Sequence, residues 1–400
     1  RHMDLVHKIL QGLAVSKSQR HFIEGLLVTI LVTRGKITFR NLSRYSGLCE
    51  RTYARHFSQE MDWIGFNRRV INAVFSPDSP RVVAFDPSFI PKAGKHTFGR
   101  SSFWNGLKSR SEKGLEISTV SVIDLTRNQA LPLSVEQTQP VSDAEEGVSL
   151  IDRYVGHIRT VHPYLGPNES YICVDGGLAR TKFIDGVCEL GCHVIGKLRH
   201  DARMRYLYQG PQQPGPGRPK TYDGRVEWTD RSRLTLAGSD ETFWVYTAVL
   251  NHPHFKRNLR IVRLVPLPGV SIRSEILLFC TDTTLDPCTI YRSYKARFQI
   301  EFIYRDGKQF TGLADAQVRR ADRLDFHFNA TLAALNVAKA QQINAQPKDQ
   351  PATCSIASLK AEYFNRHYLE RFISIFDLDP TWIKKHPGYK SLREYGKIAA

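Results

Sequence analysis

The chain has 400 residues, and its 56 Lys and Arg outnumber its 39 Asp and Glu, which gives a formal charge of +17. A hydrophobic content of 42% is enough for a buried core and excludes a disordered basic tail. Because like charges repel in a compact chain, this surplus indicates a polyanionic partner such as nucleic acid, a basic surface kept only for solubility being the alternative. The longest apolar run is too short to cross a bilayer.

Residues 1–78 are predicted to form a helical module. The 3.6-residue spacing of apolar residues between Phe22 and Val32 predicts an amphipathic helix. Two short helices around a turn at 37–57 fit a helix-turn-helix, whose second helix enters the major groove of DNA. Arg51 and Arg55 lie on that second helix and are candidate DNA ligands. An ordinary helical hairpin with a solvated basic face is the alternative.

Strand-like and helix-like segments alternate over residues 79–197, the pattern of an α/β sheet. Strands are expected at 82–86, 115–125, 130–137, 171–175 and 193–197, with helices over 143–160 and 179–190. Two of the apolar strands end in a carboxylate, namely Asp86 and Asp175. Carboxylates at strand ends occur in many α/β proteins, so the two are a weak signal alone.

Residues 198–288 begin with a loop rich in Pro and Gly and continue as alternating strands, which predicts a β-rich insertion. Gly217, Arg218 and Pro219 form the core of an AT-hook, a segment that binds the narrow minor groove, and Lys220 follows it. A flexible loop with two cations is the alternative. Helices are again predicted over 289–308 and 321–342, in a segment that spans 289–345. The tail 346–400 is also predicted to be helical.

The helix predicted at 289–308 carries several functional side chains on one face. At about 100° per residue, Tyr294, Arg297, Glu301 and Lys308 fall within an arc of about 60°, and Arg305 extends the same stripe. A solvated charged face is the alternative. Apolar residues flank the stripe, however, which indicates a packed helix whose charges need partners.

Tyr294, Arg297, Glu301 and Lys308 resemble, with their spacing, the Y-R-E-K signature of DDE transposases from bacterial cut-and-paste insertion sequences. The resemblance implies an α/β fold in which an RNase H-like mixed-sheet core, 79–197 and 289–345, is interrupted by the insertion. It implies that Asp86, Asp175 and Glu301 hold two Mg²⁺ ions, which Mn²⁺ can replace. Such hard cations bind carboxylates and phosphate oxygens, and a pair of them supports in-line displacement at phosphorus.

The same resemblance implies a DNA transposase that binds terminal inverted repeats, cleaves the strands and joins them to target DNA as a homodimer. Phosphate contacts are expected from the cations of the stripe, from Tyr294 and from Lys92, and base stacking from Trp244 or Trp228. The expected location is the bacterial cytoplasm, at the nucleoid, with no membrane association. An RNase H-like nuclease without strand transfer and a domesticated DNA-binding regulator are the alternatives.

Overall fold

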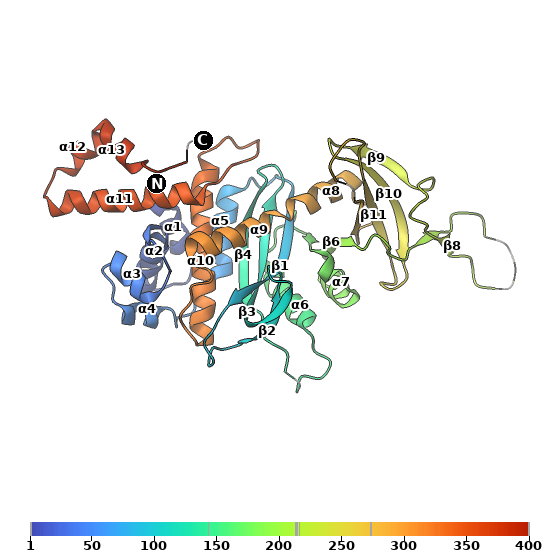
Figure 1. Ribbon diagram of the computed structural model, residues 1–400, viewed down its shortest axis with the longest axis horizontal. Coiled ribbons are helices and arrows are strands. Elements are labelled where there is room, and N and C mark those ends of the chain that lie inside the picture. The colour runs from blue at the N-terminus through green and yellow to red at the C-terminus, as the bar shows by residue number, and fades with distance from the viewer. Residues whose placement is uncertain (1, 143, 213–214, 216, 273, 399–400) are drawn as a thin grey trace. The chain divides into compact units, whose positions relative to one another are not determined.

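The computed structural model describes residues 2–142, 144–212, 215, 217–272 and 274–398 and shows a mixed α/β protein (Figure 1). The chain divides into two compact units. The first unit comprises residues 1–79, 87–142 and 299–400, and the second comprises 80–86 and 143–298. Strand β1 (Arg81–Pro91) passes from the second unit into the first after Asp86.

The first unit is built on helices that share one apolar core. These are α1 (His2–Gln11), α2 (Lys17–Val32), α3 (Phe39–Tyr45), α4 (Glu50–His56), α5 (Trp63–Val74) and α10 (Ala321–Asn344). Phe22, Tyr53 and Phe66 are buried together with Phe326 of α10. Each of α2, α3 and α5 begins at a capping side chain, which satisfies a backbone N–H that the helix leaves unpaired. The N-terminal helices therefore fold against α10 as one body.

A meander of strands completes the first unit: β2 (Ser101–Asn105), β3 (Arg110–Asp124) and β4 (Gln129–Gln137). Helices α5 and α10 pack on β4 (Figure 1). Two polar side chains of α10 are buried there and bond to strand carbonyls, Asn336 Nδ2 to Pro132 at 2.7 Å and Lys339 Nζ to Ala130 at 2.8 Å. Burial without such partners would be costly, so these bonds fix how α10 sits on the strand. Helix α9 (Gln299–Asp306) and a π-helical turn (Gly307–Thr311) also belong to this unit.

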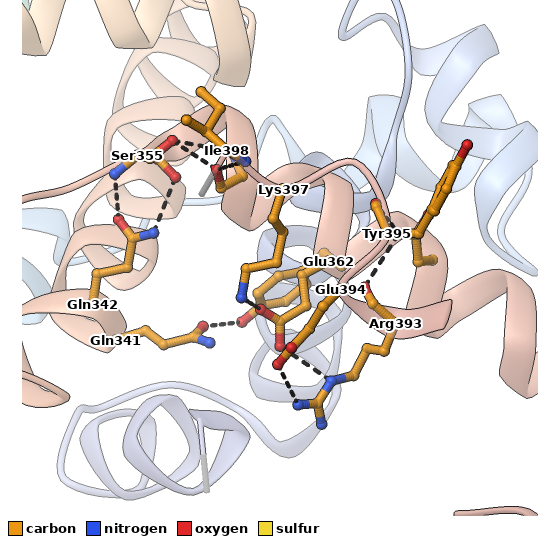
Figure 2. A network of polar contacts seen from close by, with 12 residues as sticks. Gln341, Gln342, Ser355, Glu362, Arg393, Glu394, Tyr395, Lys397 and Ile398 are labelled. Atoms are coloured by element: carbon orange, nitrogen blue, oxygen red, sulfur yellow. Dashed lines mark hydrogen bonds and ion pairs between the residues drawn. The ribbon is translucent and has the colours of Figure 1, made fainter. Parts of the chain in front are cut away.

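The C-terminal helices α11 (Ile356–Ile375) and α13 (Pro387–Arg393) are joined by polar contacts, which Figure 2 shows, and α12 (Pro380–Lys385) lies between them in the chain. Glu362 of α11 binds Lys397 Nζ at 2.9 Å and Arg393 Nε at 3.4 Å. The backbone N–H of Ile398 donates to Ser358 Oγ at 3.0 Å. One glutamate thus holds the end of the chain against α11.

The second unit is a large mixed sheet with strand order β1-β5-β6-β12-β11-β10-β7-β8, and β9 pairs with β10. The strands after β1 are β5 (Tyr171–Cys173), β6 (His193–Leu198), β7 (Arg205–Leu207), β8 (Tyr222–Arg225), β9 (Thr235–Ser239), β10 (Phe243–His252), β11 (Arg257–Pro266) and β12 (Ile276–Cys280). Strands β1, β5 and β6 are parallel, whereas β12 pairs antiparallel with β6. The segment predicted as an insertion thus continues the sheet from β6.

Helices α6 (Leu150–Val161), α7 (Thr181–Cys188) and α8 (Pro287–Ala296) pack within the second unit, with short 3₁₀ turns at His162–Tyr164 and Gly176–Leu178. The helix predicted over 143–160 begins at Leu150, because Ser149 and Asp152 form a capping box there; residue 143 lies outside the described residues. Among the residues that the structure describes, no helix combines the length and apolar character needed to cross a membrane.

Candidate active site

Two aspartates belong to neighbouring parallel strands in the second unit: Asp86 lies within β1, and Asp175 follows the end of β5. Strands β1 and β5 pair with Val83 opposite Ile172 and Ala84 opposite Cys173. The same register, continued by two residues, sets Asp86 level with Asp175. Neighbouring strands lie about 4.8 Å apart, and residues opposite one another project from the same face. The sheet therefore places two carboxylates side by side.

The two faces of this sheet have different neighbours. The ring of Phe85 lies 5.6 Å from Tyr154 and 5.9 Å from Phe183, so Phe85 points toward α6 and α7. Side chains alternate along a strand, and Asp86 must therefore project from the opposite face. On that face burial raises the pKa of the Cys173 thiol, and the charge of Arg297 acts against this rise.

Tyr294 and Arg297 lie at the end of α8, near Asp175. The guanidinium of Arg297 lies 5.5 Å from the centroid of the Tyr294 ring. Burial raises the pKa of the Tyr294 phenol, and the Asp175 carboxylate adds to the rise while Arg297 opposes it. A neutral phenol and a guanidinium beside a carboxylate can donate hydrogen bonds to a phosphate that approaches the strand end.

The turn after Asp175 holds its carboxylate in place. Asp175 Oδ1 accepts a hydrogen bond from the backbone N–H of Gly177 at 2.7 Å, and the 3₁₀ turn begins there. A Cβ atom on Gly177 would lie 3.1 Å from that oxygen, so glycine permits the close approach. Arg180 Nε donates to the Gly177 carbonyl at 3.0 Å and closes the turn. The carboxylate is thus oriented by backbone before any ligand arrives.

The prediction of a single helix from 289 to 308 is wrong. Helix α8 ends at Ala296, and α9 begins at Gln299. Between them the N–H of Arg297 is shared by the carbonyls of Ser293 and Tyr294, and the N–H of Phe298 bonds to a carbonyl three residues back. Next comes the π-helical turn, whose wider winding changes the direction of Lys308. Tyr294 and Arg297 therefore belong to the second unit, whereas Glu301, Arg305 and Lys308 belong to the first.

Within the first unit, Glu301 and Arg305 are exposed on α9, and Arg305 pairs with Asp306 at 2.8 Å. Lys308 is half-buried and donates to Ser88 Oγ at 2.9 Å and to the Phe89 carbonyl at 3.1 Å. Those two acceptors lie just after Asp86 in the chain. Lys308 thus secures the part of β1 that follows the first aspartate.

The remaining predicted DNA ligands have varied surroundings. Arg51 and Arg55 are exposed on α4, on the side away from buried Tyr53. Burial lowers the pKa of Lys92, which donates to the Ala316 carbonyl. Arg218 is exposed in the loop before β8, and in the same loop Lys220 pairs with Asp223 at 2.9 Å.

The two predicted stacking tryptophans are both half-buried. Trp228 Nε1 donates to the Ala202 carbonyl at 2.8 Å, and Trp244 lies on β10, a strand that is paired on both sides. A third tryptophan, Trp104 on β2, is 61% exposed. Sequence reasoning missed it because the pattern of β2 does not reveal which of its faces is solvated.

Lys197 is a second residue that sequence reasoning missed. Strands β5 and β6 pair with Cys173 opposite Ile195, so Lys197 is level with Asp175, and its side chain is exposed. Three parallel strands thus present Asp86, Asp175 and Lys197 at one level. The available signal was a charged residue at the end of a third apolar strand.

The donor chemistry at these strand ends fits a divalent cation. Carboxylate oxygens are the ligands that Mg²⁺ prefers, and a pair of them on adjacent strands is the kind of partial shell this ion completes with water and phosphate. Across the described residues, no group of three His, Cys, Asp or Glu side chains gathers closely enough to hold a metal. Within the second unit, Asp86 and Asp175 are the carboxylates that the strand register sets at one level.

Comparison with known proteins identifies the family. A family model described as a transposase DDE domain matches residues 77–337, more than half of the chain. No curated protein matches the chain. Among solved structures, it is similar to endonuclease V of Ciona intestinalis bound to a 24-mer DNA containing an inosine followed by a ribo-adenosine, at 13% identity and a TM-score of 0.26, over 58% of this chain and 87% of that one.

A substituted form of the same enzyme, bound to a 23-mer DNA, matches at 12% identity and a TM-score of 0.27, over 62% of this chain and 90% of that one. Structural likeness of this extent identifies neither the fold nor the activity. The family model spans both strand-end aspartates and Glu301. This chain belongs to the family of transposases with a DDE domain.

Proposed function

We propose that this protein is a DNA transposase of the bacterial insertion-sequence type that binds the terminal inverted repeats of its element, cleaves their strands and joins them to target DNA. The observation that carries the proposal is the pair Asp86 and Asp175 at one level of adjacent parallel strands. The pair lies inside a segment that matches the DDE domain. Membership of this family implies a transposase or nuclease activity that depends on a divalent metal.

In this proposal Asp86, Asp175 and Glu301 hold two Mg²⁺ ions, for which Mn²⁺ substitutes. The ions supply a nucleophilic oxygen at neutral pH and stabilise the leaving oxygen. The chain's own contribution is orientation: the Gly177 N–H fixes one oxygen of Asp175, and Lys308 secures the continuation of β1 after Asp86. Glu301, exposed on α9, is the third proposed ligand.

Tyr294 and Arg297 are proposed to bind the phosphate that is cleaved. Tyr294 lies within the electrostatic reach of both Asp175 and Arg297, and a guanidinium can bind two phosphate oxygens at once. Arg51 and Arg55, exposed on α4, are proposed to contact the inverted repeat, and Arg218 and Lys220 the flanking duplex. Because two ends must be joined in one event, the acting form is proposed to be a homodimer, working at the bacterial nucleoid.

The experiment is a cleavage and joining assay with purified protein and a duplex that carries the inverted repeats flanking the reading frame. Asp86→Asn, Asp175→Asn and Glu301→Gln are each expected to lower Mg²⁺-dependent nicking at least about a hundredfold, because several kcal/mol of charge stabilisation are lost. Glu189→Gln, at an exposed carboxylate after α7, is the matched control and should cleave normally.

Three results would contradict the proposal. Nicking that survives Asp175→Asn at the wild-type rate removes the aspartate pair from the chemistry. Normal nicking without transfer of the cleaved 3′ ends to a target plasmid identifies a nuclease instead of a transposase. Binding of the end duplex by a protein that cleaves under no metal condition identifies a DNA-binding regulator.

A further inference from the structure

A cleft of about 1090 Å³ opens in the second unit directly after the Asp175 turn. Gly176 and Gly177 line it on one side, and Lys197 and Arg199 line it at the end of β6. The opposite wall is the tip of the β10–β11 hairpin, where His254 and Lys256 are exposed. The cleft is at the upper end of the roughly 300–1,000 Å³ typical of ligand pockets, so it has room for part of a polymer.

The lining of the cleft carries uncompensated positive charge. Five cationic side chains face it, against two carboxylates: Arg180, Lys197, Arg199, Lys256 and Arg257, with Asp185 and Asp201. The carboxylates are already engaged, since Arg199 binds Asp201 through two bonds of 3.0 and 3.1 Å and Arg257 binds Asp185.

For Lys197 and Lys256, no ion pair forms within the described part of the chain, and Arg180 bonds to a backbone carbonyl. Three cations thus line one cleft without a carboxylate partner among the described residues. An anion that enters lowers their mutual repulsion, and a polyanion does so at several points together.

The hairpin that forms the far wall is held rigidly. The backbone N–H of Phe255 donates to His252 Nδ1 at 3.1 Å, and the two rings stack with centroids 3.8 Å apart. Burial lowers the pKa of His252 to about 4, so this ring stays neutral and keeps its acceptor nitrogen at physiological pH. Phe255 is buried, which anchors the tip, and Lys256 adopts a left-handed backbone with φ of +52°. The lysine is therefore presented by a fixed loop.

We propose that this cleft is a binding site for the sugar-phosphate backbone of DNA, and that it holds the strand that leaves the Asp175 end of the sheet. The proposal rests on the DNA-cleaving function proposed above. In this proposal Lys197, Arg180 and Lys256 all bind phosphates of the same DNA strand. Lys197 stands nearest to the chemistry, because the sheet register sets it level with Asp175.

The test measures binding of the full-length protein to a fluorescein-labelled 30-base-pair duplex of random sequence in EDTA, over a range of salt concentrations. Each lost phosphate contact lowers the slope of log K against log salt by about 0.9. Lys197→Gln combined with Lys256→Asn should therefore lower the slope by about 1.8 and weaken binding about 30-fold at 0.15 M salt. Asparagine tolerates the positive φ at residue 256, so the loop is retained.

The matched control is Lys182→Gln on α7, which also removes one exposed cation from this unit but pairs with Asp152 at 2.6 Å outside the cleft. It should leave the slope unchanged. If the double variant melts at a lower temperature than wild-type, Lys256→Asn alone provides the test, with an expected slope change of about 0.9.

The outcomes separate this proposal from the one on which it rests. An unchanged slope in the cleft variants, with cleavage still dependent on Asp175, overturns the cleft as a DNA site and leaves the transposase function standing. A reduced slope in the cleft variants, with cleavage indifferent to Asp175→Asn, supports the cleft and overturns the catalytic assignment. An equal loss of slope in Lys182→Gln shows a nonspecific charge effect and also overturns the cleft.

Discussion

A buried ion pair at the start of the two aspartate-bearing strands makes a strong prediction about stability. Arg81, the first residue of β1, donates from Nη1 to Glu169 Oε1 at 2.9 Å, with side chains 7% and 0% exposed. The second oxygen of Glu169 accepts the N–H of Gly166 at 2.8 Å, in the turn that leads to β5. The pair thus joins the beginnings of the two strands that lead to Asp86 and Asp175.

Arg81→Met removes the guanidinium and leaves the Glu169 carboxylate, which is 0% exposed, without this cation. Loss of one partner from such a pair costs about 3–5 kcal/mol, because the remaining buried charge is no longer balanced by its partner. The double variant Arg81→Met with Glu169→Met removes both charges and should recover most of that loss, since hydrophobic replacement of a buried pair is often neutral.

Urea unfolding, monitored by circular dichroism, measures the free energy of unfolding of the wild-type protein, of Arg81→Met and of the double variant. Arg110→Met is the control, because its partner Glu112 forms an exposed pair, 66% exposed on the arginine side, which should contribute less than about 1 kcal/mol. The reasoning is refuted if Arg81→Met costs no more than the control. It is also refuted if the double variant is as unstable as Arg81→Met alone.

Two further predictions concern a buried histidine and the lysine beside Ser88. Burial lowers the pKa of His157 in the folded protein to about 3, whereas the pKa of this histidine in the unfolded chain is near 6.5. Below pH 6.5 the unfolded chain therefore binds a proton at His157 that the folded protein does not bind, and the free energy of unfolding falls. Between pH 7 and pH 5 wild-type should lose about 2 kcal/mol more than His157→Leu, and equal losses in unfolding titrations would contradict this. Lys308→Met removes two charge-assisted hydrogen bonds to β1 and should lower the free energy of unfolding by about 2–4 kcal/mol, with a smaller loss in Lys308→Arg. If Lys308→Met and Lys308→Arg melt at the same temperature, Lys308 does not anchor β1.

Local pattern was enough to predict the strands next to the aspartates, although β1 continues to Pro91 and does not end at Asp86 as predicted. Short apolar runs before Asp86 and Asp175 allow few readings other than buried strands, and the structure has β1 and β5 there. A run of this kind says nothing about which strands are neighbours. The register that sets Asp86, Asp175 and Lys197 at one level arises from pairings between distant segments, so Lys197 was missed.

The break between α8 and α9 could not be predicted from the sequence, for a different reason. Neither Pro nor Gly occurs at Arg297 and Phe298, and helical periodicity runs through both residues. The chain nevertheless changes there to tighter hydrogen bonds, and a π-helical turn follows at Gly307. Such changes are decided by packing of the flanking segments and leave no mark in composition or spacing.

The way β12 returns to β6 limits how this protein can be recombined with its relatives. Strand β12 closes the segment after β6 by pairing along β6 itself, from Leu277 opposite Leu198 to Cys280 opposite Ile195. A chimaera that exchanged the segment as an independent cassette would strip β6 of its neighbour and expose a row of unpaired backbone groups, a template for aggregation. Exchange of the outer strands alone, with β11 and β12 kept from this chain, preserves the edge.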